Sequence, residues 1–215
     1  FIYLSHIYIY IYSHIYISIY VQENNEARWV KMDKIKYTAP DGKQRDWEMT
    51  SRTTRPANAE CDGVGILAII EDEVSGPRVI LQKQFRPPVE GICIEMPAGL
   101  VDPNESLETC ALRELKEETG YIGKVLSTSP IIFNDPGFCN TNMAMVIVSV
   151  DMEDERNKNP QTQLEENEFI ETFTVPLKEF AESLEKLANE GYKLDARVQN
   201  VAEGIKVAKT LKLFG

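Results

Sequence analysis

Three glutamates in one short segment have the spacing that suits chemistry on a diphosphate. Glu114, Glu117 and Glu118 stand at positions i, i+3 and i+4, so a helix through them would gather three carboxylates on one face. Carboxylates this close repel one another, and a hard divalent cation with oxygen ligands relieves that repulsion. Magnesium shares phosphate oxygens with a substrate and supplies an activated water, which is the chemistry of diphosphate hydrolysis.

Two further charged residues extend this acidic face. Arg113 lies one turn before Glu117 and can hold a glutamate through a forked ion pair. Glu105, in the loop before the predicted helix, can fold back onto the same centre. The alternative is a solvated acidic helix, but ordinary solvated helices interleave lysine with glutamate and need no flanking glycines. The pattern therefore favours a metal-binding helix.

Local signals define where this helix begins and ends. Ser106 is a suitable N-cap, and Gly120 suits the left-handed residue that follows a helix. An apolar stripe at helical spacing predicts the buried side of the helix, and its residues are Ala111, Leu112 and Leu115.

Length and charge predict one soluble domain that does not bind nucleic acid. The 215 residues suffice for a full core, and the net charge of −11 argues against nucleic-acid backbone or anionic membrane as partners. The cysteines are scattered without metal-site spacing and are expected to be small buried residues of a reducing, cytoplasmic compartment: Cys61, Cys93, Cys110 and Cys139.

Residues 1–20 form a low-complexity run of alternating isoleucine and tyrosine. A strand of this pattern would have no polar face, and the run fits poorly as a membrane span, signal peptide or transit peptide. We expect this segment to lie outside the fold, as the translation of an AT dinucleotide repeat. Its two histidines, His6 and His14, are therefore not expected to be catalytic.

From residue 21 onward the chain is predicted to be α+β. Segments 28–32 and 35–37, with a turn signal at Asp41-Gly42, predict a small antiparallel sheet in a subdomain spanning residues 21–60. A main domain is expected over residues 61–215, with strands at 63–70, 79–85, 143–150 and 169–175. Residues 151–163 are expected to form a loop, and helices are predicted over residues 176–189 and 196–211.

The segment 99–121 resembles the Nudix box, G-x5-E-x7-R-E-U-x-E-E-x-G-U with U aliphatic, at every position except the last, where Tyr121 stands. Further segments resemble the ADP-ribose pyrophosphatase (ADP-sugar diphosphatase) branch of the Nudix hydrolases, of eukaryotic type. They are Trp29-Val-Lys, Trp47-Glu-Met-Thr-Ser-Arg52-Thr-Thr-Arg55, Lys83-Gln-Phe-Arg86-Pro-Pro, Glu95-Met-Pro-Ala98-Gly99-Leu100, Pro136 and Leu194-Asp-Ala-Arg197.

This resemblance implies a Nudix α/β/α sandwich around a mixed sheet and assigns roles to residues. Trp29 and Trp47 would sandwich the adenine, a mode of base binding that stacking supports, although core packing is the commoner use of tryptophan. Arg52 and Arg86 would contact the phosphates and ribose; the alternative of a surface charge is stronger for Arg55 than for Arg86, which ends an apolar strand. The implied metal ligands are Glu114, Glu117, Glu118 and the carbonyl of Ala98, and the implied sugar contacts are Leu100 and Asp135.

The general base is implied to come from an acidic loop after the box, within residues 164–169. Glu166 and Glu168 both remain candidates, and a carboxylate there need only reach a water activated by the cation. Glu168 is favoured because it adjoins a predicted strand.

The implied activity is Mg²⁺-dependent hydrolysis of ADP-sugars, chiefly ADP-ribose, to AMP and ribose 5-phosphate, with Mn²⁺ as a substitute cation. Members of this branch are homodimers that exchange their N-terminal sheets, so the same is expected here. Three alternatives stay open: another Nudix substrate such as an oxidised nucleoside diphosphate, NADH or a dinucleoside polyphosphate; a non-catalytic ADP-ribose sensor; and a structural protein with an acidic helix.

Overall fold

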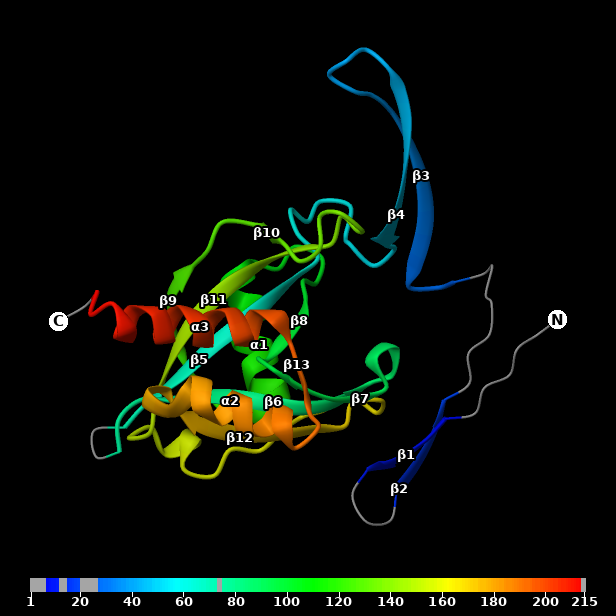
Figure 1. Ribbon diagram of the computed structural model, residues 1–215. Coiled ribbons are helices and arrows are strands. Elements are labelled where there is room, and N and C mark those ends of the chain that lie inside the picture. The colour runs from blue at the N-terminus through cyan, green and yellow to red at the C-terminus, as the bar shows by residue number, and fades with distance from the viewer. Residues whose placement is uncertain (1–6, 12–14, 20–26, 73–74, 214–215) are drawn as a thin grey trace.

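A mixed sheet of nine strands forms the centre of the molecule (Figure 1). The computed structural model describes residues 7–11, 15–19, 27–72 and 75–213. The main path of the sheet runs β10-β11-β5-β6-β7-β13, while β12 pairs with β6, β8 with β5 and β9 with β11. The strands are β5 (Gly63–Glu71), β6 (Arg78–Arg86), β7 (Gly91–Glu95), β8 (Ala98–Leu100), β9 (Lys124–Thr128), β10 (Ile132–Phe133), β11 (Asn142–Asp151), β12 (Ile170–Pro176) and β13 (Lys193–Leu194).

Helices cover both faces of this sheet, as the α/β/α prediction requires. The helix α1 (Leu107–Thr119) packs its buried Ala111 and Leu115 against one face, where β5 and β11 run parallel. The helices α2 (Phe180–Asn189) and α3 (Ala196–Thr210) cover the other face with Phe180 and Val198. Short 3-10 turns are η1 (Pro87–Val89), η2 (Glu155–Asn157) and η3 (Leu177–Glu179).

The sheet has one hydrophobic core on each face, and both cores depend on the alternation of side chains along the strands. Ile66 of β5 faces the α1 side, whereas Leu67 packs on the α2 and α3 side. The same alternation places Val146 and Met145 of β11 on opposite faces. Burying both faces of the central strands explains why they read as nearly continuous apolar runs in the sequence.

A separate antiparallel hairpin precedes the main domain. It consists of β3 (Val30–Thr38) and β4 (Gln44–Arg52), and Figure 1 shows it projecting away from the nine-stranded sheet. The predicted turn is present, with Gly42 at φ +79°. Segments 28–32 and 35–37 are not separate strands as predicted: β3 is continuous, because nine consecutive residues pair with β4.

The low-complexity segment contributes its own two-stranded sheet. The strands β1 (Ile7–Ile11) and β2 (Ile15–Ile19) pair with each other and belong to neither of the other two sheets. His6 and His14 lie outside the described residues. The expectation that this segment lies outside the functional domain stays a prediction. The domain boundaries at residues 20 and 60 also stay predictions. Among the described residues no helix is long and apolar enough to cross a membrane.

The cysteines follow the prediction at three of four positions. Cys61, Cys93 and Cys110 are buried with free thiols, whereas Cys139 is partly exposed. Burial raises the pKa of the Cys110 thiol far above its usual range, and the nearby carboxylates of Glu105 and Glu114 add to this effect, so the thiol stays protonated.

Candidate active site

The helix α1 begins and ends at the residues that its sequence predicts. The Oγ atom of Ser106 accepts a hydrogen bond of 3.2 Å from the backbone N–H of Thr109. Gly120 adopts φ +77°, and a Cβ atom there would come within 2.3 Å of the backbone nitrogen of Gln161. Gly120 therefore both ends the helix and lets the segment around Gln161 approach it closely.

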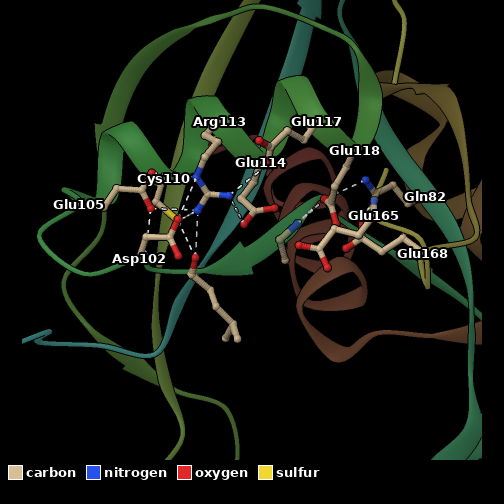
Figure 2. A network of polar contacts seen from close by, with 12 residues as sticks. Gln82, Asp102, Glu105, Cys110, Arg113, Glu114, Glu117, Glu118, Glu165 and Glu168 are labelled. Atoms are coloured by element: carbon tan, nitrogen blue, oxygen red, sulfur yellow. Dashed lines mark hydrogen bonds and ion pairs between the residues drawn. The ribbon is translucent and has the colours of Figure 1, made fainter. Parts of the chain in front are cut away.

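Arg113 holds three carboxylates rather than one. Its Nε and Nη2 atoms each donate to a different oxygen of Glu105 over 2.9 Å. Its Nη1 atom donates to Glu114 over 2.7 Å and to Glu117 over 3.1 Å (Figure 2). The forked pair lowers the pKa of Glu105, so that carboxylate stays ionised. In this structure Arg113 therefore offsets the charge repulsion that the sequence pattern predicted.

Glu118 lies on the buried side of the same cluster. Its Oε2 atom accepts hydrogen bonds of 3.0 Å from Gln82 Nε2 and from the backbone N–H of Ala98. Burial raises the pKa of Glu118 to about 7 despite these two donors. Within the described chain no hydrogen bond reaches its Oε1 atom, so this oxygen can bind a cation.

The predicted glycine before the helix creates the space for Glu114. A Cβ atom on Gly99 would lie 1.8 Å from the carboxyl carbon of Glu114, so any side chain there would displace this carboxylate. Burial also raises the pKa of Glu114, with Arg113 opposing this effect and Glu117 adding to it. A buried carboxylate with a raised pKa in an acidic neighbourhood is the environment that a cation would stabilise.

The donor chemistry of this cluster fits a hard divalent cation. Glu114, Glu117 and Glu118 supply carboxylate oxygens. The backbone of half-buried Ala98 lies next to them, because its N–H donates a hydrogen bond to Glu118. Among the described residues, no three acidic, histidine or cysteine side chains already converge as a finished metal site. Figure 2 shows Arg113 bonding oxygens of Glu114 and Glu117.

The acidic loop after the box reaches the same cluster. The backbone N–H of Gln163 donates a 2.6 Å hydrogen bond to the carbonyl of Glu117, which ties the start of the loop to α1. Glu165 and Glu168 line the cavity beside the helix, and the Glu165 N–H donates to Glu168 Oε2 over 3.0 Å. Figure 2 shows both carboxylates close to Glu118. Glu166 is exposed and does not line the cavity.

The cavity itself has a volume of about 580 Å³ and is lined by side chains of both charges. Glutamates of α1 and of the acidic loop line it together with four arginines, one of which, Arg113, belongs to α1. Its lining includes Arg52, Asp62, Arg86, Ala98, Gly99, Leu100, Arg113, Glu114, Glu117, Asn134, Asn142, Met143, Gln163, Glu165, Glu168 and Arg197. Among the predicted substrate contacts, Arg52, Arg86 and Leu100 lie here, whereas Asn134 lines the cavity in place of its neighbour Asp135.

Arg86 and Arg55 are both held by buried carboxylates. Arg86, at the end of β6, donates two hydrogen bonds to Glu95 over 2.8 and 2.6 Å. The surface-charge alternative, which the sequence made stronger for Arg55 than for Arg86, does not hold: Arg55 forks onto Asp62 over 2.9 and 2.6 Å and also donates to Asn142. This clamp joins the segment after β4 to the starts of β5 and β11, and thereby positions the backbone near Arg52.

The two tryptophans lie on one face of the β3–β4 hairpin but far apart. Trp47 of β4 pairs with Ile35 of β3. Trp29 lies one residue before the first residue of β3, and its carbonyl accepts a hydrogen bond from the Thr53 N–H. Six residues of strand separate the two positions, which corresponds to about 20 Å. Both side chains are exposed, at 58% for Trp29 and 49% for Trp47. Within one chain they are therefore not brought together around one base.

Sequence reasoning missed several residues that line the cavity. Asp62 and Asn142 meet only because β5 and β11 pair, and 80 residues separate them. No sequence motif marked Gln163 as a site residue, and Glu165 was marked only by its position in the acidic loop of residues 164–169. Arg197 stood within a matched segment, but no role was assigned to it.

Comparison with known proteins finds one matching family model and several proteins of similar sequence. The model of the NUDIX domain matches residues 61–198. The chain is 56% identical over 191 residues to the ADP-ribose pyrophosphatase of Saccharomyces cerevisiae, covering 88% of this chain and 82% of that protein. It is 37% identical over 187 residues to the ADP-sugar pyrophosphatase of Mus musculus, with coverage of 86% and 85%.

A solved structure supports the same architecture. A crystal structure of an ADP compounds hydrolase aligns with a TM-score of 0.59 and 20% identity, covering 89% of this chain and 91% of that chain. At this identity the likeness concerns the fold alone. The α/β/α sandwich is therefore confirmed independently of the close relatives.

Proposed function

Because the chain belongs to the NUDIX domain family, we propose that it is a hydrolase that cleaves the diphosphate bond of ADP-sugars, ADP-ribose above all. The products would be AMP and ribose 5-phosphate. One observation carries this proposal: the acidic helix α1, Arg52 and Arg86 line the same cavity. A diphosphate between two sugars needs both kinds of group, because its charge must be held by arginines and offset at the reacting phosphorus.

The metal cofactor that we propose is Mg²⁺, in a family that generally uses divalent cations. Glu114, Glu117, Glu118 and the carbonyl of Ala98 would hold it, which matches the preference of Mg²⁺ for oxygen ligands. When bound, the cation neutralises phosphate charge and lowers the pKa of a water. Arg113 already contacts two of these glutamates and would keep their side chains oriented toward the cavity.

Glu168 is the general base that the geometry supports. Glu168 lines the cavity, and its negative charge contributes to the raised pKa of both Glu114 and Glu118. A hydrogen bond from the Glu165 backbone orients its carboxylate. Glu168 would accept the proton of the attacking water, and Glu165 is the nearest substitute.

The position of the tryptophans supports a homodimer with exchanged N-terminal sheets. One chain cannot sandwich an adenine between side chains about 20 Å apart along a strand. A second copy related by a twofold axis would bring its own Trp29 to the Trp47 of the first chain, or the reverse. The hairpin presents an apolar face for such a partner, because Ile35 and Tyr37 also point to the tryptophan side and are exposed.

A substrate panel tests the proposed activity. The chain is incubated with ADP-ribose, ADP-glucose, NADH, an oxidised deoxyguanosine diphosphate and a dinucleoside polyphosphate, each with Mg²⁺ or with EDTA. Release of AMP from ADP-ribose with Mg²⁺ supports the proposal. Cleavage of another compound in preference would keep the hydrolase and replace the substrate. Stabilisation by ADP-ribose without turnover would mean that the chain is a sensor.

A further inference from the structure

The chain uses the same Asp-x-Arg arrangement twice, at Asp154–Arg156 and at Asp195–Arg197. In both, the aspartate caps a helical turn by accepting from the backbone N–H of the arginine, over 2.9 and 2.8 Å. In both, the arginine Nε and Nη2 atoms fork back onto the same aspartate. The two arrangements are therefore locally equivalent.

Their surroundings differ. Arg156 lies at the surface, with 67% of its side chain exposed, and follows the cap of the short turn η2. Arg197 lies at the start of α3 with only 28% exposed, and it lines the cavity with Arg52 and Arg86. The cap itself needs only the aspartate. Capping therefore does not explain why a guanidinium at residue 197 reaches the cavity wall.

The contacts of Arg197 that the structure describes leave its Nη1 atom without a carboxylate partner. Asp195 engages Nε and Nη2, whereas Nη1 lies 3.2 Å from the sulfur of Met143, which also lines the cavity. A thioether is a weak acceptor, so it leaves Nη1 able to donate to a stronger one. Arg86 and Glu95 lie within electrostatic range of Arg197.

Two arginines that line one cavity repel each other, but here each carries its own carboxylate. Glu95 forks onto Arg86, and Asp195 forks onto Arg197. Both guanidiniums are thereby fixed in orientation before any ligand arrives, which reduces the entropy lost on binding. An anion that entered the cavity would meet two oriented donors.

We propose that Arg197 is a further substrate-binding residue, which donates from Nη1 to an oxygen of the substrate's diphosphate next to Arg86. This inference rests on the proposed function of the cavity and deepens it. It adds a third arginine to the two that resemblance assigns, and it makes the start of α3 part of the binding site.

Two substitutions separate binding from a structural role. Arg197→Gln removes the charge, whereas Arg197→Lys keeps a cation for Asp195 but loses the second donating edge. Arg156→Gln is the matched control in the equivalent surface arrangement. For each variant we would measure the thermal midpoint, the kcat and KM for ADP-ribose with Mg²⁺, and the Kd for ADP-ribose in EDTA by calorimetry.

The proposal predicts that Arg197→Gln raises KM and Kd about tenfold or more, as expected for loss of a charged hydrogen bond, with a smaller change in kcat. Arg197→Lys should restore the thermal midpoint but not the affinity. Arg156→Gln should match the wild type in KM and Kd. Unchanged Kd in Arg197→Gln, or affinity that returns together with stability in Arg197→Lys, would overturn the proposal.

The binding measurement in EDTA keeps the two proposals distinguishable. If the wild type binds ADP-ribose but releases no AMP, the proposed activity fails while the Kd comparison still decides the role of Arg197. If the wild type neither binds nor cleaves ADP-ribose, both proposals fail.

Discussion

The backbone N–H of Gln163 donates a 2.6 Å hydrogen bond to the carbonyl oxygen of Glu117. This bond joins the end of α1 to the loop that carries Glu165 and Glu168. The glutamates of α1 and those of the loop are thereby held at one cavity, although 47 residues separate Glu118 from Glu165 in the sequence. Gly120 permits the approach, because any side chain there would collide with Gln161.

The loop geometry predicts that Glu168 and Glu166 differ in importance. Glu168→Gln should lower kcat by about a hundredfold or more, because general-base catalysis contributes that much. Glu166→Gln, two residues away in an exposed position, should leave kcat within a factor of about two, the scale of a screened surface charge. Steady-state assays of both variants with ADP-ribose check this, and an equal loss in both would contradict the assignment.

Glu118 should destabilise the metal-free protein as the pH rises. Its pKa is raised from 4.5 to about 7 in the folded state, so the folded chain binds more protons than the unfolded chain in this window. Stability should therefore fall as the pH rises from 4.5 to about 7. Denaturant unfolding in EDTA should show this fall, and Glu118→Gln should reduce it. An identical pH dependence in the variant would refute the argument.

The Arg55–Asp62 clamp should stabilise the fold and fail only in acid. Burial alone would raise the pKa of Asp62, but hydrogen bonds from Arg55 and from the Asn142 N–H lower it below 3.8. Its stabilisation is therefore present above pH 3.8 and lost as the pH falls through the lowered value.

Urea unfolding at neutral pH tests this clamp. Arg55→Gln should cost about 3 kcal/mol, because it leaves a buried carboxylate without its partner. The exposed pair Lys34–Asp46 supplies a control, since Lys34→Gln should cost about 0.5 kcal/mol or less. Equal costs for the two variants would mean that the Asp62 site is solvated.

The proposed exchange of hairpins can be tested by mixing two variants that each bind the substrate weakly. Trp29→Ala and Trp47→Ala should each raise KM for ADP-ribose, because stacking contributes to both the bound substrate and the transition state. If each adenine lies between tryptophans of two subunits, a mixed dimer regains one intact site, so co-refolded variants should recover activity. No recovery, in a mixture shown to be dimeric by light scattering, would exclude shared sites.

Local features of the site were predictable, and long-range ones were not. Ser106 and Gly120 act through neighbours on their own helix, so the bounds of α1 follow from the sequence. The partnership of Asp62 with Arg55 and Asn142 depends on sheet pairing, so Arg55 resembled a surface charge. Glu165, Glu166 and Glu168 share a composition, and only the path of the loop distinguishes them. Strands as short as β8 and β13 carry too few residues to show a period.

The central claim is that the α1 glutamates hold the cation used to hydrolyse ADP-ribose. The most direct measurement is AMP release from ADP-ribose by the wild type and by Glu118→Gln, each with Mg²⁺ and with EDTA. The account predicts AMP and ribose 5-phosphate from the wild type with Mg²⁺, none in EDTA, and a rate lowered by about a hundredfold or more in Glu118→Gln. Undiminished AMP release in EDTA, or from Glu118→Gln, would contradict it.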